Sequence, residues 1–312
     1  MRPLLLLAAC LAHGAPVAAR AQAAAPGPSV AFTFDDGPKL GPTPLLSPQA
    51  RNQALLAALA KHHVTAALFV TVANGADQPE GLALARAWGA AGHFIGNHTV
   101  THPDLNSEKV SLAAYQKEVL DCDAVIRALP GYQKWLRFTY LREGNTLEKR
   151  DGMRAFLKSI GYRNAYVSID TSDWRLGAAL ASLLQKSPAA DLTQVKGIYL
   201  AHVWQRAEAY SALSRRLLGR EIPQVILLHH NLINALWLDE VIAQFKAKGW
   251  AITDPATAFA DPVYQLQPER DRPGQSLLLS MGRVLGLKEF EGWERLVDDG
   301  DFEVAELEKS YK

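Results

Sequence analysis

Strand-like and helix-like segments alternate along most of this chain, and that alternation most constrains its fold. Short apolar, β-branched segments recur between about residues 30 and 253, and each is followed by a stretch with apolar residues at helical spacing. This order is typical of parallel βα units. So many units in one domain favour a barrel over an open sheet. We therefore expect a distorted (β/α) barrel of about seven parallel strands, with a C-terminal appendage.

The apolar periodicity also predicts where each element lies. The expected strands span 30–34, 65–72, 94–95, 135–138, 166–169, 225–228 and 250–253. The expected helices span 51–62, 79–91, 110–129, 148–160, 176–186, 205–218 and 235–248, with a short one near 275–286. The periodicity fades after Pro255, and the chain becomes Pro-rich and then acidic. We therefore place the barrel domain at 24–258 and the C-terminal extension at 259–312.

The N-terminus has the pattern of a secretory signal, with a charged start, an apolar run from Leu4 to Leu11, and Ala-x-Ala sites within 19–23. We expect a signal peptide at 1–23 and export to the periplasm or medium. The apolar run is too short to span a bilayer. An Ala-rich disordered terminus and a lipid anchor at Cys10 are the alternatives. If Cys10 is removed, Cys122 is the only cysteine left, which excludes an internal disulfide, and we expect its thiol to be buried.

The charge balance argues against a nucleic-acid partner. The chain has 33 basic and 32 acidic side chains, for a formal net charge of +1. A surface that follows phosphates needs an excess of basic side chains. The balance is compatible with an uncharged polysaccharide substrate, as with many others. We expect a monomer with no transmembrane segment.

Polar residues follow the expected strands at the points where the strands end. In parallel βα barrels the carboxyl ends of the strands form the rim where catalytic groups collect. The residues in these positions are Asp35, Asp36, His98, Arg137, Asp170, Asp173 and His229.

Asp35 and Asp36 form the first candidate cluster. Successive side chains of a strand point to opposite sides, so the two carboxylates should take different roles, one as a metal ligand and one as a base. An ordinary Asp-Gly-Pro turn with solvated carboxylates is the alternative for this cluster taken alone.

His98 and His102 form the second cluster. Histidines at i and i+4 meet on one helical turn and can both reach a divalent ion, although a lone pair at this spacing can arise by chance. With Asp36 as third ligand, they would give two imidazoles, one carboxylate and an open position for water. This set recurs in catalytic zinc sites.

At this point the chain resembles a known family, the polysaccharide deacetylases with a NodB-type domain (carbohydrate esterase family 4). The resemblance runs from about residue 28 to 258 through five short motifs in the family's order. The motifs are Thr33-Phe34-Asp35-Asp36-Gly37-Pro38, His98-Thr99-x-x-His102, Arg137-Phe138-Thr139-Tyr140, Asp170-Thr171-Ser172-Asp173-Trp174 and Leu227-Leu228-His229.

The first two motifs imply a metal-dependent hydrolase. By the resemblance, Asp35 is the general base, and Asp36, His98 and His102 hold the metal ion. Zinc is the ion that the family implies, and cobalt or nickel would also suit such a site.

The third motif implies that Arg137 orients Asp35 and that the Tyr140 N–H helps to hold the oxyanion. A purely structural salt bridge is the alternative for Arg137. The family usually has proline where this chain has Thr139, so we expect a less rigid turn here.

The last two motifs imply the acid side of the reaction. Trp174 would wall the acetyl pocket, Leu227 would line the methyl pocket, and His229 would be the general acid, paired with Asp173. Trp174 as plain core and His230 as the acid remain alternatives. We expect His202, in an aromatic stretch, to be structural.

The family's activity would be removal of N-acetyl groups from an amino-sugar polymer or oligomer, such as chitin oligomers, peptidoglycan or poly-N-acetylglucosamine; acetylated xylan would be a further substrate. Two other functions stay open. The same scaffold could hydrolyse small amides or cyclic imides, or the protein could bind glycans without catalysis.

Overall fold

The computed structural model describes residues 27–269, 275–287, 296–297 and 300–310. The signal peptide expected at 1–23 and Cys10 lie outside these residues. Cys122 is buried, as expected. Within the described ranges, no helix combines the length and the apolar character that crossing a bilayer requires.

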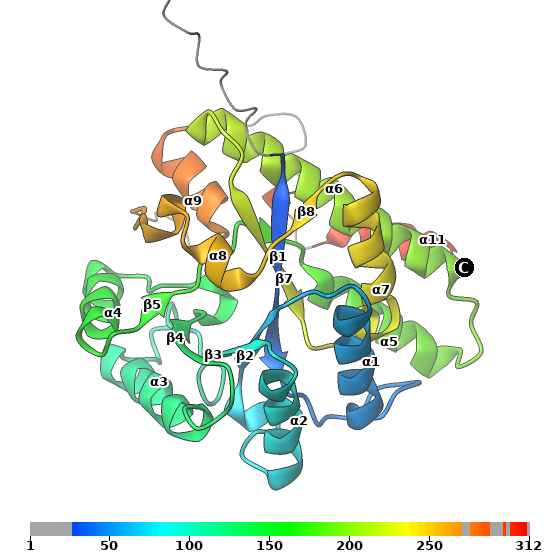
Figure 1. The fold of residues 1–312 in the computed structure, drawn as a ribbon, viewed down its shortest axis with the longest axis horizontal. Helices are drawn as coiled ribbons and strands as arrows, with labels where there is room; N and C mark the ends of the chain where they lie inside the picture. Colours follow the sequence, from blue (N-terminus) through cyan, green and yellow to red (C-terminus); the bar gives the residue numbers. More distant parts are fainter. Residues whose placement is uncertain (1–26, 270–274, 288–295, 298–299, 311–312) are drawn as a thin grey trace, which may run out of the picture.

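One curved sheet of eight strands organises the described chain (Figure 1). Its order is β5-β4-β3-β2-β1-β7-β6, β8 pairs with β1, and every strand pairing described is parallel. Strands β5 and β6 end the order, so in the described part of the chain the barrel is not closed between them. The strands are β1 (Ser29–Gly37), β2 (Ala67–Val70), β3 (Phe94–Asn97), β4 (Tyr132–Leu136), β5 (Arg163–Asn164), β6 (Ile169–Asp170), β7 (Pro223–His229) and β8 (Ala251–Ile252).

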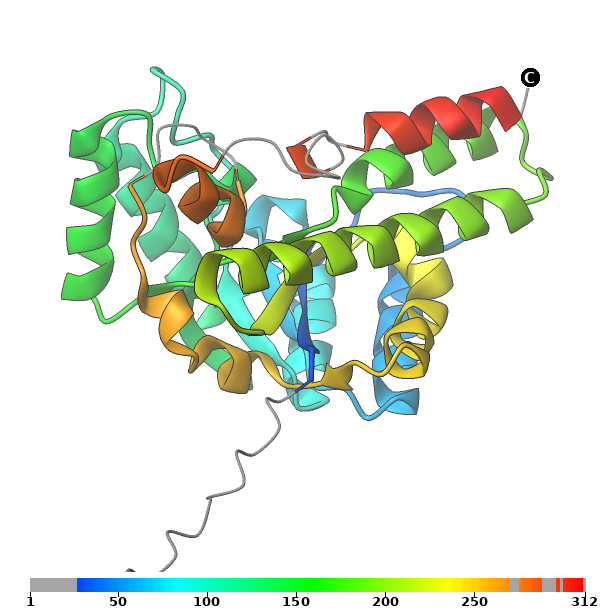
Figure 2. The same cartoon turned by 90° about the horizontal axis from the view of Figure 1, so that it is seen from above.

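Helices surround the sheet, as the βα order predicts (Figure 1). The helices of the barrel domain are α1 (Pro48–Lys61), α2 (Pro79–Ala90), α3 (Leu112–Ile126), α4 (Leu147–Ser159), α5 (Asp173–Lys186), α6 (Thr193–Leu218), α7 (Leu232–Ala247) and α8 (Pro255–Phe259). Two more follow, α9 (Leu277–Val284) and α11 (Asp301–Ser310). Helix α9 packs on α6, and α11 packs on both α5 and α6 (Figure 2).

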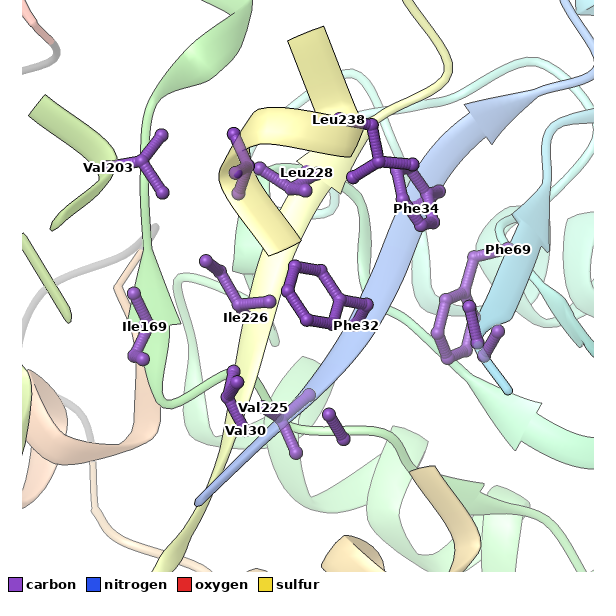
Figure 3. Close-up of a cluster of buried hydrophobic side chains, with 14 of the residues drawn as sticks. Val30, Phe32, Phe34, Phe69, Ile169, Val203, Val225, Ile226, Leu228 and Leu238 are labelled. Atoms are coloured by element: carbon purple, nitrogen blue, oxygen red, sulfur yellow. The ribbon is translucent and has the colours of Figure 1, made fainter. Parts of the chain in front are cut away.

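The core forms where β1 and β7 run side by side under α7 (Figure 3). The side chains of Phe32, Phe34 and Leu228 are completely buried there, and Leu238 of α7 is almost completely buried. Burying a side chain of this size contributes about 1.5–3 kcal/mol. Both faces of β1 are covered, which is why its sequence is a nearly continuous apolar run. The register aligns Asp35 with His229 at the carboxyl ends of the two strands.

Several predicted bounds differ from the structure, and two elements differ most. The helix expected at 205–218 begins at Thr193, because Val195, Ile198, Tyr199, His202 and Val203 extend its buried stripe toward the N-terminus. The strand expected at 166–169 is reduced to Ile169–Asp170. There the Ser168 hydroxyl accepts a hydrogen bond from the Val225 N–H at 2.7 Å, so a side chain replaces a main-chain partner in the ladder.

Candidate active site

The carboxyl ends of five strands bring the predicted polar residues to one rim of the sheet. Asp35 and Asp36 are among the last three residues of β1, and His229 is the last residue of β7, which ends one residue later than expected. His98 and Arg137 each follow directly after a strand, β3 and β4. The predicted convergence of these residues is therefore observed.

Left-handed backbone conformations concentrate at this rim. A positive φ costs a non-glycine residue about 1–3 kcal/mol, and such strain clusters at functional sites. Most of the non-glycine residues with positive φ in the described ranges belong to the five motifs or adjoin one of them. They are Asp36, Thr99, His102, Tyr140, Leu141 and Ser172.

The two adjacent carboxylates approach the same imidazole. Asp35 Oδ2 lies 3.6 Å and Asp36 Oδ1 3.7 Å from His98 Nε2. The argument that strand alternation sends them to opposite sides is therefore wrong. Asp36 has φ 67, which departs from strand geometry and turns its side chain back toward the site.

Asp35 is held by a buried guanidinium. Arg137 Nη1 donates to Asp35 Oδ1 at 2.9 Å, and both side chains are almost completely buried. Arg137 also donates to Thr33 Oγ1 at 3.3 Å and to the Ala165 carbonyl at 2.6 Å. Burial raises the pKa of Asp35 to about 6, although the charge of Arg137 opposes this shift. A carboxylate with this pKa is suited to accept a proton near neutral pH.

Asp36, His98 and His102 could together hold a metal ion. Each offers a ligand atom, and these atoms all lie within 4.8 Å of one another. The two imidazole rings meet edge to face at 4.9 Å. They do not share a helical turn, so that part of the prediction is wrong. Instead the loop reverses through left-handed Thr99 and His102, and Thr99 Oγ1 accepts a hydrogen bond from the His102 N–H at 3.1 Å.

The chemistry of this cluster fits a divalent ion. Asp36 Oδ1 is buried and makes no hydrogen bond to the described residues. The Arg137 carbonyl lies 2.7 Å from His98 Nδ1, which fixes the ring so that Nε2 faces the carboxylates. Burial lowers the pKa values of His98 and His102 to about 4, so both imidazoles are neutral. Neutral imidazoles and an ionised carboxylate are the forms that bind metals.

His229 and Asp173 form a second pair at the same rim. Asp173 Oδ1 lies 2.6 Å from His229 Nδ1, and its Oδ2 accepts from the His229 N–H at 3.0 Å. Asn231 and Asn234 also donate to that oxygen, at 2.9 and 2.5 Å. Burial lowers the pKa of His229, but Asp173 outweighs this effect and raises it to about 9. The imidazole therefore carries a proton at neutral pH.

His230 is placed quite differently. It is completely buried, with Nε2 3.0 Å from Asn52 Oδ1 and its ring beside Trp88. Burial lowers the pKa of His230 to about 3, so it is neutral at physiological pH. A neutral and completely buried histidine is poorly suited to protonate a substrate.

Aromatic and apolar side chains surround the rim. Tyr140 is 51% exposed, and its ring meets that of His102 at 4.5 Å. Trp174 is 47% exposed, so the alternative that it belongs to the core is wrong. Leu227 is buried in a small apolar cluster with Leu141 and Val167.

The turn before Tyr140 is well braced, contrary to our expectation. The Thr139 N–H donates to the Tyr115 hydroxyl at 3.2 Å, and Thr139 Oγ1 lies 3.0 Å from the same hydroxyl. Thr139 Oγ1 also donates to the Pro103 carbonyl. Tyr115 and the two asparagines on Asp173 were missed by sequence reasoning. Only Asn231 had a signal, as a residue that caps a helix directly after the His229 motif.

The fold and the site together define a class of protein: an incomplete parallel (β/α) barrel with a candidate Asp/His/His metal site at its strand ends. Residues 22–165 match the family model described as polysaccharide deacetylase. Over these residues, a little under half of its length, the chain is similar to the polysaccharide deacetylase family. The last two motifs, at 170–174 and 227–229, lie beyond the matched residues.

Curated relatives agree with this family. The chain is 28% identical over 232 residues to a peptidoglycan-N-acetylglucosamine deacetylase of Bacillus cereus, covering 70% of this chain and 64% of the relative. It is 39% identical over 100 residues to a chitooligosaccharide deacetylase of Sinorhizobium fredii, covering 32% of this chain and 40% of the relative. The chain thus spans less than two thirds of the length of either relative.

Solved structures share the fold. The chitin deacetylase of Colletotrichum lindemuthianum superposes with a TM-score of 0.52 at 20% identity, covering 74% of this chain and 87% of that one. A pseudoenzyme of carbohydrate esterase family 4 from Bacillus anthracis superposes with a TM-score of 0.51 at 16% identity, covering 75% of this chain and 66% of that one. At these identities the likeness concerns the fold alone.

Proposed function

We propose that this protein is a metal-dependent hydrolase that removes N-acetyl groups from an amino-sugar polymer or oligomer. The observation that carries the proposal is that three ionisable side chains at one rim have different partners. Asp35 is held by Arg137, the Asp36 oxygen facing His98 and His102 has no hydrogen bond, and His229 is held protonated by Asp173. The names of the curated relatives support an amino-sugar substrate.

Asp36, His98 and His102 would hold the ion. A divalent ion at this position would polarise the amide carbonyl and acidify water, and zinc, cobalt and nickel all suit two imidazoles and a carboxylate. The protein's part is to keep both imidazoles neutral and to direct His98 Nε2 inward through the Arg137 carbonyl.

Asp35 acts as the general base and His229 as the general acid. Asp35 accepts a proton from the attacking water, while Arg137 keeps its carboxylate in place. As the C–N bond breaks, His229 donates a proton to the amine nitrogen, because an amine anion is too basic to leave without it. Asp173 and its two asparagines hold the imidazole in position for this transfer.

The remaining residues would shape the acyl site. The Tyr140 N–H would donate to the oxyanion that develops on the carbonyl oxygen, an interaction typically worth about 3–4 kcal/mol. Leu227 would line the space for the acetyl methyl group, and exposed Trp174 would form its outer wall. We assign the catalytic domain to 24–258.

Acetate release from a panel of acetylated glycans tests this function. The panel should contain chitin oligomers, peptidoglycan, poly-N-acetylglucosamine and acetylated xylan, with simple amides and cyclic imides alongside. We expect release from at least one amino-sugar substrate, loss of activity on exhaustive chelation, and recovery with zinc or cobalt. Undiminished activity in protein that elemental analysis shows to be metal-free would exclude the metal mechanism. Glycan binding without acetate release would favour the binding function.

We also propose export, on the signal pattern at 1–23 alone. The expected mature N-terminus follows Ala21 or Ala23. N-terminal sequencing of the protein from the periplasm or medium tests this, and an intact Met1 on the functional protein would contradict it.

A further inference from the structure

The segment 170–174, which connects β6 to the start of α5 and carries Asp173, is contacted by side chains of α6. Arg206 Nη1 donates to the Asp170 carbonyl at 3.3 Å, and His202 Nε2 binds the Thr171 carbonyl. Both side chains are almost completely buried. Two consecutive carbonyls of this segment thus bind side chains of one helix.

The C-terminal helix α11 places a carboxylate, Glu303, beside His202. Glu303 Oε1 lies 3.2 Å from His202 Nδ1, and both side chains are buried. Burial raises the pKa of Glu303, but its bond to His202 and the charges of His202 and Arg206 outweigh this and lower it to about 2. Glu303 is therefore ionised.

His202 links the two elements through both nitrogens of its ring. Nε2 contacts the Thr171 carbonyl, and Nδ1 contacts the Glu303 carboxylate. Removing the carboxylate would leave a buried ring nitrogen without this partner, which is costly.

The same segment also contacts β7 and the residue that binds the candidate acid, His229. Thr171 Oγ1 donates to the Leu227 carbonyl at 2.7 Å, two residues before His229 on β7. The Asp173 N–H donates to Thr171 Oγ1 at 3.4 Å, and Asp173 binds His229 at 2.6 Å. An unbroken series of contacts thus runs from α11 to the His229 ring.

We propose that α11 is a positioning element of the acid–base pair, acting from Glu303 through His202 and Thr171 on Asp173 and His229. The expected effect of α11 on the reaction rate rests on the proposed function. The expected effect of α11 on the His229 ring does not. The C-terminal extension is then part of the catalytic apparatus and not only a cover for α5 and α6. Neither Glu303 nor His202 touches the substrate in this role.

Glu303→Gln in the full chain, loaded with zinc, tests the proposal. The matched control is Asp301→Asn, which removes the exposed ion pair of the same helix with Arg175 of α5. Two readouts are needed: kcat and KM for acetate release, and the pKa of the His229 ring by NMR, assigned by comparison with His229→Ala. Asp173, Asp36 and Asp35 all influence this ring, and only Asp173 lies on the proposed route.

We expect Glu303→Gln to lower kcat about tenfold, which corresponds to about 1.4 kcal/mol, with little change in KM. The His229 pKa should fall below that of the unsubstituted zinc-loaded protein, because Asp173 is less well placed to raise it. Asp301→Asn should leave both unchanged. His202→Gln breaks the same route, so it should lower the His229 pKa similarly, and the double variant should be no worse than the poorer single variant. If Glu303→Gln does not yield folded protein, His202→Gln supplies the same comparison with Asp301→Asn.

Three results would overturn the proposal. The first is a His229 pKa and kcat in Glu303→Gln that match those of Asp301→Asn. The second is a lower melting temperature of Glu303→Gln with both readouts unchanged. The third is additive effects of Glu303→Gln and His202→Gln in the double variant. Failure of the proposed function looks different. In that case no acetate is released by any variant, yet Glu303→Gln still lowers the His229 pKa and the positioning role stands.

Discussion

Asp35 and Asp36 are neighbours in the chain and bring one oxygen each to within 3.7 Å of the same nitrogen, His98 Nε2, yet only Asp35 is paired with a guanidinium. The Asp36 oxygen that faces His98 and His102 is buried without a hydrogen bond in the described chain. The different roles that we propose for them therefore rest on their partners and not on opposite directions of their side chains.

We expect Asp36→Asn and Asp35→Asn to separate metal binding from proton transfer. Asp36→Asn should lose metal and activity together, because a ligand charge is removed. Asp35→Asn should keep its metal and lose about 10²–10⁴ in rate, the typical contribution of a general base. Metal content by elemental analysis and turnover on both purified variants check this. Equal metal loss in both variants, or loss only in Asp35→Asn, would reverse the assignment.

Arg137→Met should shift the acid limb of the pH–rate profile upward. Arg137 lowers the pKa of Asp35 against the effect of burial, so its removal raises that pKa above about 6. Because the base must be ionised, activity then appears only at higher pH. The variant should also lose about 3–5 kcal/mol of stability, since it leaves a buried carboxylate unpaired. Arg154→Met, which breaks a partly buried pair with Glu143 that does not include Asp35, should destabilise the fold without moving the limb.

His229→Ala and His230→Ala should fail in different ways. The first removes the proposed acid at the rim, so activity should fall by about 10²–10⁴ while the metal and the fold remain. The second removes a completely buried ring beside Trp88, so it should lower the melting temperature with a smaller effect on kcat. Greater loss of kcat in folded His230→Ala would transfer the acid role to that residue.

Asp173→Asn should move the alkaline limb of kcat to lower pH. The acid must be protonated, so activity falls as pH rises through the His229 pKa, which Asp173 raises to about 9. Without the Asp173 carboxylate, burial lowers the His229 pKa and this partner no longer raises it. The alkaline limb therefore shifts toward neutral pH. A pH–rate profile from pH 6 to 10 measures the shift. An unchanged alkaline limb in Asp173→Asn would mean that another group sets it.

Thr139→Pro should not improve this chain, although proline is usual at the position in the family. Proline has no N–H for the Tyr115 hydroxyl and no hydroxyl for the Pro103 carbonyl. Leaving a buried hydroxyl poorly satisfied costs about 1–3 kcal/mol. Thermal unfolding should show this loss, and Tyr115→Phe in the Thr139→Pro background should recover part of it. A more stable Thr139→Pro variant would show that the network adds little.

The sequence by itself determined the architecture and which residues converge at the candidate site. Alternating apolar segments require parallel βα units, because each strand must bury both faces under helices. Parallel strands place their carboxyl ends at one rim, so the residues that follow them must converge there. The positions of Asp35, His98, Arg137 and His229 at that rim follow from this reasoning.

Only the tertiary structure decided how these residues are oriented and what holds them. The left-handed backbone at Asp36 and Thr99 reverses the directions that ideal strand and helix periodicities predict, and such strain persists only where surrounding contacts support it. The support comes from residues distant in the chain, such as Asn234 on Asp173 and Glu303 on His202. Local periodicity carries no information on such pairings, because they exist only when the packed elements bring the side chains together.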